Sequence, residues 1–277
     1  MISPKEILKK YWGFSEFRPQ QETIISAVLE KKDVITLLPT GGGKSICFQV
    51  PTIAKEGVCI VISPLIALMQ DQVENLSQKG IKAITISSGT TQDGLITDNI
   101  KFGGIKFLYI SPERLQSSFI QQKIKELPVN LIAIDEAHCI SEWGHDFRPE
   151  YRNLRRIVDR LGNNIPIIGL TATATPKVQG DIQKNLGMDD AQVFKASFNR
   201  PNLYYEVRPK TEHVDRDIIK FIKGHMGKSG IIYCLSRKRV EELAETLQVN
   251  GINALPYHAG LDAKSRVRHQ DAFLMED

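Results

Sequence analysis

A lysine and a serine that follow three consecutive glycines are the residues of this sequence most suited to chemistry on phosphates. The glycines come shortly after an apolar segment that begins at Val34. They let the chain bend so that successive backbone N–H groups point at one anion, and a following helix adds its positive end. Lys44 is placed to reach the outer phosphates of a nucleotide, and the Ser45 hydroxyl to hold a magnesium ion. The predicted phosphate loop comprises Thr40, Gly41, Gly42, Gly43, Lys44 and Ser45.

One position departs from the usual phosphate-loop pattern. The pattern G-x-x-x-x-G-K-[ST] expects glycine where this chain has Leu38. A glycine-rich turn on the surface is therefore the alternative interpretation. The apolar strand expected before the glycines and the helix expected after them both favour the phosphate loop.

Two adjacent acids close another apolar segment, residues 131–134. At the end of a buried strand, Asp135 would orient magnesium, largely through its waters. Glu136 would position or deprotonate an attacking water molecule. A solvated pair of loop acids is the alternative. His138 has no partner histidine four residues on, so we expect it to form hydrogen bonds rather than bind a metal.

An amide and an aromatic side chain lie upstream of the glycines. Gln21 can donate and accept hydrogen bonds together, which suits the edge of an adenine, and Phe14 could stack on the ring. The alternative is a simple entry to a helix with a packed aromatic side chain, and spacing alone favours that alternative.

Aromatic residues and an arginine are concentrated just after the two acids, in residues 141–151. Such a combination makes a stacking platform for single-stranded bases. A small apolar cluster that holds the loop in place is the alternative, and composition does not decide between them. The residues concerned are Trp143, His145, Phe147, Arg148 and Tyr151.

The elements that must position these residues are alternating strands and helices. Continuous apolar runs are typical of strands buried in a parallel sheet covered on both faces. Ligands bind at the carboxyl ends of such strands, which is where the motifs lie. Strands are predicted at residues 34–38, 58–62, 83–86, 106–110, 131–134 and 166–170, helices at 5–12, 18–29, 45–53, 66–78 and 176–186, and a loop–helix excursion at 89–104.

A turn-rich boundary near residues 196–212 precedes what looks like the opening of a second α/β domain. Three basic residues, 237–239, fall at the start of a predicted helix, where a cation is unfavourable unless an anion offsets it. A bound phosphate backbone would do so, and a solvated charge cluster is the alternative. Strands are predicted at 203–207, 230–234 and 253–256, and helices at 213–223, 237–249 and after residue 261.

The composition is that of a globular protein with a substantial core. The chain has 277 residues, of which 42% are hydrophobic and 25% charged, and a net charge of +4 that is compatible with a nucleic-acid partner. The four cysteines lack the C-x-x-C spacing of a zinc site, which favours reduced core residues. We find no signal-peptide or membrane-spanning run and expect a cytoplasmic protein, associated with the nucleoid if bacterial.

Nine short motifs together carry a resemblance to a known family. Five are similar to the serial motifs of superfamily two helicases, and four more narrow the resemblance to the RecQ family, in which position 38 does not hold glycine. The resemblance covers essentially the whole chain. The first five are Phe17–Gln21, Thr40–Ser45, Ser63–Leu65, Ser111–Arg114 and Asp135–His138, and the other four are Cys139–Tyr151, Leu170–Ala174, Phe198–Asn202 and Tyr257–Leu261.

This resemblance implies an ATP-dependent DNA helicase that moves in the 3′-to-5′ direction and acts in DNA recombination and repair. The implied fold is α/β. A RecA-like P-loop NTPase sheet with helices on both faces occupies residues 1–200, and an incomplete second RecA-like domain occupies 201–277. ATP and Mg²⁺ are the implied cofactors, and single-stranded and partly duplex DNA is the implied partner.

The resemblance also implies roles for individual residues. Gln21 matches the adenine-reading glutamine of the family, Arg18 the arginine beside it, and Phe14 the aromatic that stacks on the base. Thr171 and Thr173 match the motif that links nucleotide state to domain movement. The loop that couples single-stranded DNA to hydrolysis is matched by Trp143, His145, Phe147 and Arg148. Motifs along the DNA path contain Pro64, Arg114, Ser236, Arg237 and His258.

The sequence differs from the family pattern at its end. It stops at Asp277, before the family's motif that supplies an arginine finger, and before its zinc and winged-helix modules. Because an arginine finger contributes on the order of a thousandfold or more to rate, we expect ATP and DNA binding with slow hydrolysis and no unwinding. The natural protein is expected to be longer. A nucleotide-gated DNA-binding module without effective turnover is the alternative function.

Overall fold

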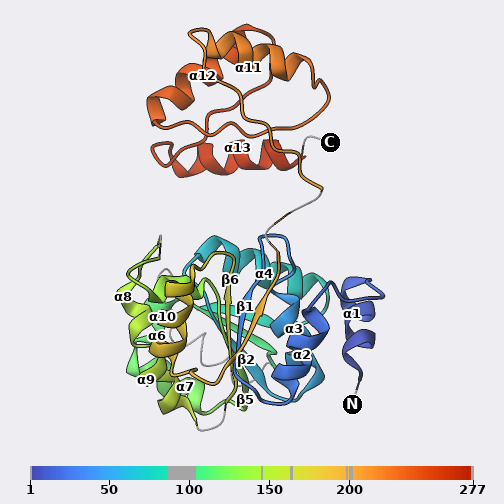
Figure 1. Ribbon diagram of the computed structural model, residues 1–277, viewed down its shortest axis with the longest axis vertical. Coiled ribbons are helices and arrows are strands. Elements are labelled where there is room, and N and C mark those ends of the chain that lie inside the picture. The colour runs from blue at the N-terminus through green and yellow to red at the C-terminus, as the bar shows by residue number, and fades with distance from the viewer. Residues whose placement is uncertain are drawn as a thin grey trace. The chain divides into compact units, whose positions relative to one another are not determined.

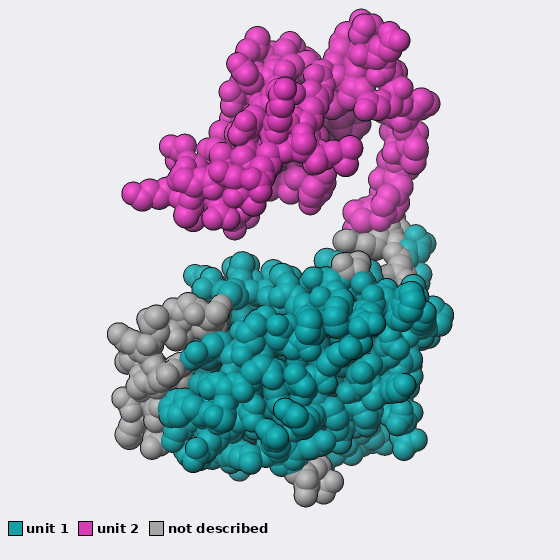
Figure 2. Space-filling model, turned by 90° about the vertical axis from the view of Figure 1, so that its left-hand side faces the viewer, with its two compact units in different colours: residues 1–201 teal, residues 202–277 magenta. Residues whose placement is uncertain are grey.

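The computed structural model of the protein describes residues 2–86, 104–144, 146–162, 165–197, 199 and 202–275. His145 and most of the predicted excursion at 89–104 lie outside the described residues. The chain divides into two units, residues 1–201 and 202–277, which Figure 2 shows in different colours. This division falls next to the boundary expected from the turn-rich sequence.

The first unit is built on one parallel sheet of seven strands, in the order β3-β4-β2-β5-β6-β1-β7 (Figure 1). Six strands coincide with the predicted apolar runs, which confirms the predicted α/β class. The seventh, β7, was not predicted, because it is a short, mostly exposed edge strand without an apolar run. The strands are β1 Val34–Leu37, β2 Val58–Ile62, β3 Ala83–Ile86, β4 Phe107–Ile110, β5 Val129–Ile134, β6 Ile167–Thr171 and β7 Gln192–Lys195.

Helices cover both faces of this sheet, as Figure 1 shows. Successive side chains of a strand point to opposite faces, so Ile60 of β2 joins one apolar cluster and its neighbour Val61 joins another. The helices of the first cluster are α6 Pro112–Leu115, α7 Ser118–Lys125, α9 Leu154–Leu161 and α10 Pro176–Leu186. Those of the second are α2 Gln21–Leu29, α3 Ile46–Ala54 and α4 Ile66–Gln78.

Three shorter or peripheral helices complete the described part of the first unit: α1 Pro4–Trp12, the 3₁₀ helix η1 Ala137–Ile140 and α8 Pro149–Arg152. A capping box between Ser3 and Glu6 starts α1, and the left-handed Gly13 ends it. Helix α2 begins later than predicted, because Gln20 has a left-handed φ of 69° that is incompatible with a helix. Arg18 therefore lies in a loop rather than in α2.

Among its described residues, 202–275, the second unit contains three helices in the predicted places: α11 Val214–Lys223, α12 Arg237–Val249 and α13 Ala263–Met275. The strands predicted at 203–207, 230–234 and 253–256 were wrong, since none of these segments pairs with another in the described structure. A helix forms through local hydrogen bonds, whereas a strand needs a neighbour along its length. None of the described helices of either unit is long and apolar enough to cross a membrane.

Candidate functional site

The glycine loop connects β1 to α3 at the carboxyl edge of the sheet. Gly43 has a φ of 78°, and a Cβ atom there would collide with the amide nitrogen of Gln21. Only glycine fits this position without strain. Leu38 is 2% exposed and belongs to the apolar cluster of α2 and α3, which explains why a leucine replaces the glycine of the usual pattern.

The side chains of Gln21 and Arg18 hold the glycine loop. Gln21 is buried, its amide oxygen accepts a hydrogen bond from the Arg18 backbone N–H at 2.9 Å, and its amide nitrogen donates to the Gly43 carbonyl at 3.0 Å. The Arg18 guanidinium donates to the carbonyl of Gly41. An amide oxygen has a second lone pair and an amide nitrogen a second hydrogen, so this arrangement leaves capacity for a base.

A pocket of about 380 Å³ opens beside the loop and brings together most of the predicted nucleotide residues. Phe14, 57% exposed, is among them, whereas Thr40 and Gly42 belong to the loop without lining the pocket. Sequence reasoning did not identify Leu8 and Trp12 of α1 as residues of this pocket. The lining residues are Leu8, Trp12, Phe14, Glu16, Arg18, Gln21, Gly41, Gly43, Lys44, Ser45 and Ile46.

The two acids lie at the carboxyl end of β5. Burial and the adjacent Glu136 carboxylate raise the pKa of Asp135 to about 6, and the Lys44 ammonium opposes this shift. The lysine of the glycine loop thus acts electrostatically on this carboxyl, although β6 separates β1 from β5 in the sheet. Glu136 has a left-handed φ of 48°, which is uncommon for a residue with a side chain and is found at functional sites. The backbone N–H of Glu136 donates to Asp135 Oδ1 at 3.0 Å.

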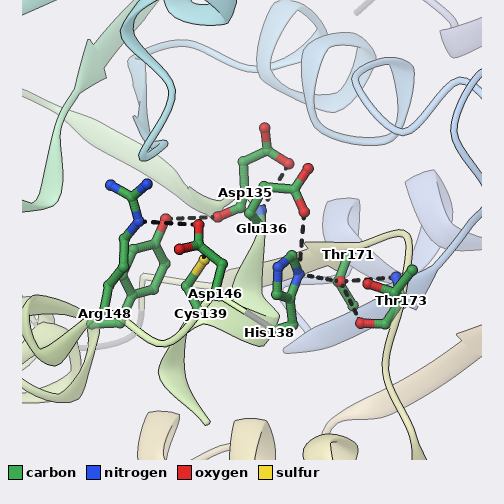
Figure 3. Close-up of polar contacts among 9 residues, drawn as sticks. Asp135, Glu136, His138, Cys139, Asp146, Arg148, Thr171 and Thr173 are labelled. Atoms are coloured by element: carbon green, nitrogen blue, oxygen red, sulfur yellow. Dashed lines mark hydrogen bonds and ion pairs between the residues drawn. The ribbon is translucent and has the colours of Figure 1, made fainter. Parts of the chain in front are cut away.

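His138 joins the second acid to the end of β6, as Figure 3 shows. Its Nδ1 lies 3.2 Å from Glu136 Oε2 and 2.9 Å from Thr171 Oγ1. Because Thr171 donates its one hydroxyl hydrogen to the Thr173 carbonyl at 3.1 Å, this arrangement places a hydrogen on Nδ1 of the imidazole. The hydrogen bonds expected of His138 are therefore present.

The described part of the aromatic-rich loop contains an exposed ring and an anchored arginine. The indole of Trp143 is 66% exposed. Arg148 Nε lies 3.3 Å from Asp146 Oδ2, and its Nη1 lies 3.5 Å from the carbonyl of Pro64. Phe147 is half-buried, with the Arg152 guanidinium 5.1 Å from its ring centroid.

The loop is attached to the carboxyl end of β5. Buried Tyr151 donates its hydroxyl hydrogen to the Asp135 carbonyl at 3.0 Å. Arg148 also lies 3.9 Å from Glu113 of α6, the helix that carries half-buried Arg114. Of the first-unit residues predicted along the DNA path, Pro64 contacts the aromatic-rich loop through Arg148, and Arg114 is next in sequence to Glu113, which contacts the same arginine.

The residues predicted in the second unit lie around the start of α12. Ser236 caps this helix by accepting a hydrogen bond from Arg239 N at 3.2 Å, and Arg237 is exposed. Arg239 forms an ion pair with Asp215. For this arginine, the anion expected near the helix start is therefore a carboxylate of the protein itself. Nδ1 of His258 accepts a hydrogen bond from the Gly260 backbone N–H, so the imidazole carries its hydrogen on Nε2. This Nε2 donates to the Glu241 carboxylate at 3.0 Å.

Comparison with known proteins gives matches over almost the whole chain. The family description DEAD/DEAH box helicase fits residues 18–181. The ATP-dependent DNA helicase RecQ of Pasteurella multocida is 42% identical over 97% of this chain and 42% of its own length. The protein of the same name from Bacillus subtilis is 41% identical over 99% of this chain and 46% of its own length. The chain thus spans less than half the length of these relatives.

Two solved structures share the fold at low sequence identity. The helicase MrfA bound to DNA matches with a TM-score of 0.75 at 21% identity, over 97% of this chain and 42% of its own. The Mycobacterium smegmatis helicase Lhr bound to single-stranded DNA and AMP-PNP matches with a TM-score of 0.66 at 18% identity, over 96% of this chain and 39% of the Lhr chain. Both likenesses concern the fold alone. The chain belongs to the DEAD/DEAH box helicase family, and its relatives confirm the RecQ-type resemblance of its motifs.

Proposed function

We propose that this chain is the ATP-hydrolysing motor part of a DNA helicase, which uses ATP to move 3′-to-5′ along DNA in recombination and repair. One observation supports this most strongly. The pocket that contains Lys44 and Ser45 also contains Phe14, Arg18 and Gln21. An adenine and a chain of phosphates need just these partners, an aromatic face and an amide at one end and a cation in a glycine loop at the other.

Lys44 and Glu136 take the chemical roles in this proposal. The Lys44 ammonium binds the outer phosphates and stabilises charge that develops on the transferred phosphoryl group. Glu136 positions the attacking water and accepts its proton. The Glu136 carboxylate is held within 3.2 Å of His138 Nδ1, so the imidazole keeps it in one orientation.

Ser45 and Asp135 fit the magnesium ion that this family implies. Mg²⁺ prefers oxygen ligands and is commonly bound by one or two carboxylates together with substrate phosphates. The carboxyl of Asp135 is half-buried, and its pKa is raised to about 6 by burial and by Glu136. A bound magnesium ion would oppose both effects, because its positive charge favours the ionised carboxylate. When bound, the ion neutralises phosphate charge, and Asp135 and the Ser45 hydroxyl would hold it.

Single-stranded DNA is proposed to lie over the aromatic-rich loop and the adjoining strand ends. Exposed Trp143 supplies a stacking face, and the anchored Arg148 supplies a cation on the same loop. The loop is fastened to the Asp135 backbone through Tyr151. A movement of bound DNA therefore has a short path to the acids that act on ATP.

The second unit is proposed to be the beginning of a second RecA-like domain, with Ser236, Arg237 and His258 facing DNA. Its three helices support this, since they fall where the α/β pattern places them.

Measurement of ATP binding and hydrolysis tests the proposal. Lys44→Ala is expected to weaken ATP binding and remove hydrolysis, with and without single-stranded DNA. Lys125→Ala removes an exposed lysine of α7 and serves as the matched control. ATP binding without any turnover in the parent chain would favour the nucleotide-gated binding module instead, and equal behaviour of the two variants would refute the nucleotide site.

A further inference from the structure

Helix α10 directs two side chains at the aromatic-rich loop. Lys177 and Asp181 are four residues apart and so lie on the same face of the helix. Asp181 Oδ2 accepts a hydrogen bond from the Ser141 hydroxyl at 2.6 Å. The Lys177 ammonium lies 3.0 Å from the centroid of the Trp143 ring. Two residues of one helix therefore hold two residues of the loop.

The two contacts are joined within the loop itself. Ser141 is 1% exposed, and its hydroxyl also accepts a hydrogen bond from the Trp143 backbone N–H at 3.2 Å. A hydrogen bond from a buried hydroxyl to a carboxylate is among the stronger ones in proteins. Asp181 thus fixes the backbone that carries Trp143, and Lys177 fixes the ring.

We infer that Lys177 and Asp181 are positioning residues that hold Trp143 in a DNA-free arrangement. In this arrangement the lysine covers the face of the indole ring on which a nucleobase would stack. This inference rests on the proposed contact between Trp143 and DNA. A cation over an indole and a base stacked on the same face exclude one another. Base stacking on that face therefore has to displace Lys177.

The same helix is continuous with the segment that contacts His138. Thr175 caps α10 by accepting a hydrogen bond from Val178 N, two residues after Thr173. Release of Trp143 from Lys177 thus removes one of the two contacts that join the loop to the helix that follows the Thr171–Thr173 segment. Lys177 and Asp181 connect DNA binding to that segment through α10.

Quenching of Trp143 fluorescence by acrylamide tests the contact without DNA. The chain has two tryptophans, so Trp12→Phe leaves Trp143 as the one reporter. In that background Lys177→Ala is expected to raise the quenching constant, and Lys177→Arg, which keeps a cation over the ring, to leave it near the parent value. Lys184→Ala removes an exposed lysine from the same helix and is the matched control.

Asp181→Ala is expected to raise the quenching constant as well, because it frees the backbone of the loop. Equal quenching in the parent, Lys177→Ala and Lys184→Ala proteins would overturn the inference. A rise in the control as large as that in Lys177→Ala would overturn it too, since the effect would then come from charge alone.

Binding of a fluorescent oligo(dT) strand tests the competition. A cation–π contact at an exposed site contributes about 0.5–1 kcal/mol, so Lys177→Ala is expected to tighten binding roughly two- to fivefold. The dependence of binding on salt is expected to stay unchanged. Weaker binding, with a salt slope reduced by about 0.7, would identify Lys177 as a phosphate contact and overturn the inference.

The two experiments separate this inference from the function on which it rests. A parent chain that binds no oligo(dT) would refute the proposed DNA contact and with it the competition. The acrylamide result would still decide whether Lys177 and Asp181 hold Trp143. Tighter oligo(dT) binding by Lys177→Ala, with unchanged binding by Lys184→Ala, supports both the inference and the proposed DNA contact of Trp143.

Discussion

The hydroxyl of Thr171 lies 2.9 Å from Nδ1 of His138, in the buried interior where β6 ends. His138 also contacts Glu136, and Thr171 also bonds the backbone of Thr173. These contacts form one continuous hydrogen-bonded path from the proposed catalytic acid to the segment expected to follow nucleotide state. The donors along this path have their acceptors within the path itself. Loss of one residue therefore weakens the hydrogen bonding of its neighbours.

Thr171→Val is expected to interrupt this path while keeping the shape of the side chain. The substitution removes the acceptor of the Thr173 backbone N–H and one of the two oxygens that face His138 Nδ1, while Glu136 remains as the other. Loss of these hydrogen bonds costs about 0.5–1.5 kcal/mol of folding stability. DNA stimulation of ATP hydrolysis should fall, while the affinity for ATP stays the same. Urea denaturation and ATPase assays measure the two effects.

Thr36→Val is a suitable control for this substitution, because Thr36 is a buried strand threonine whose hydroxyl contact to Gly169 O is long, at 3.4 Å. Full DNA stimulation in Thr171→Val would contradict a coupling role for the path. A double-mutant cycle with His138→Ala should give a coupling energy of about 0.5–3 kcal/mol, as for residues in one network.

Gly43→Ala is expected to abolish tight ATP binding. A Cβ at this position meets the amide of Gln21, and the left-handed φ of 78° adds strain to any other residue. Gly80→Ala is the matched control, since Gly80 has a φ of 74° but open space around its Cβ position. It should lower stability by about 1 kcal/mol and leave ATP binding intact. Equal ATP binding by both variants would show that the Gln21 contact does not shape the pocket.

The raised pKa of Asp135 predicts how the stability of the nucleotide-free, magnesium-free protein depends on pH. Its pKa is about 6 in the folded protein against 3.8 for an ordinary aspartate. Between these values the folded state holds the proton that the unfolded state has lost, so stability falls as pH rises and the loss is complete above pH 6.

Asp135→Asn removes this titration. The variant should therefore gain about 1–3 kcal/mol over the parent above pH 6, and the gain should vanish below pH 4. Urea denaturation in EDTA across this range measures it. A difference between the two proteins that does not change with pH would contradict the assigned pKa.

Trp143→Ala tests the stacking platform. Stacking of a base on an aromatic side chain is worth about 1–3 kcal/mol, so affinity for oligo(dT) should fall roughly five- to 150-fold. Phe119→Ala removes another exposed aromatic, 41% exposed on α7, and should have no effect on DNA affinity. Unaltered binding by Trp143→Ala would favour the alternative in which the aromatics only hold the loop in place.

Much of the fold was predictable because its strands are continuous apolar runs. The sequence Val58–Ile62 is buried at every position and forms β2 where expected. The edge strand β7 was missed because Gln192–Lys195 has no such run. Segments such as 203–207 carry the residue types of a strand, yet pairing depends on a neighbour that residue types alone do not specify.

The positions of Lys44 and Asp135 beyond the carboxyl ends of β1 and β5 were predictable, because each follows a continuous apolar run. Contacts between distant positions were not predictable. Gln21 was expected to read a base, and nothing in its spacing indicated that it also bonds Gly43. Ser141 and Asp181 are 40 residues apart, and only packing of α10 against the loop brings them together.

Hydrolysis of ATP by Glu136→Gln tests the central claim most directly. The amide keeps the size of the side chain but accepts no proton, so DNA-stimulated turnover should fall roughly 10²- to 10⁴-fold while ATP binds as in the parent. Glu126→Gln, at an exposed position beyond α7, should match the parent in both assays. Turnover by Glu136→Gln equal to that of the parent would contradict the assignment of this site as an ATP-hydrolysing motor.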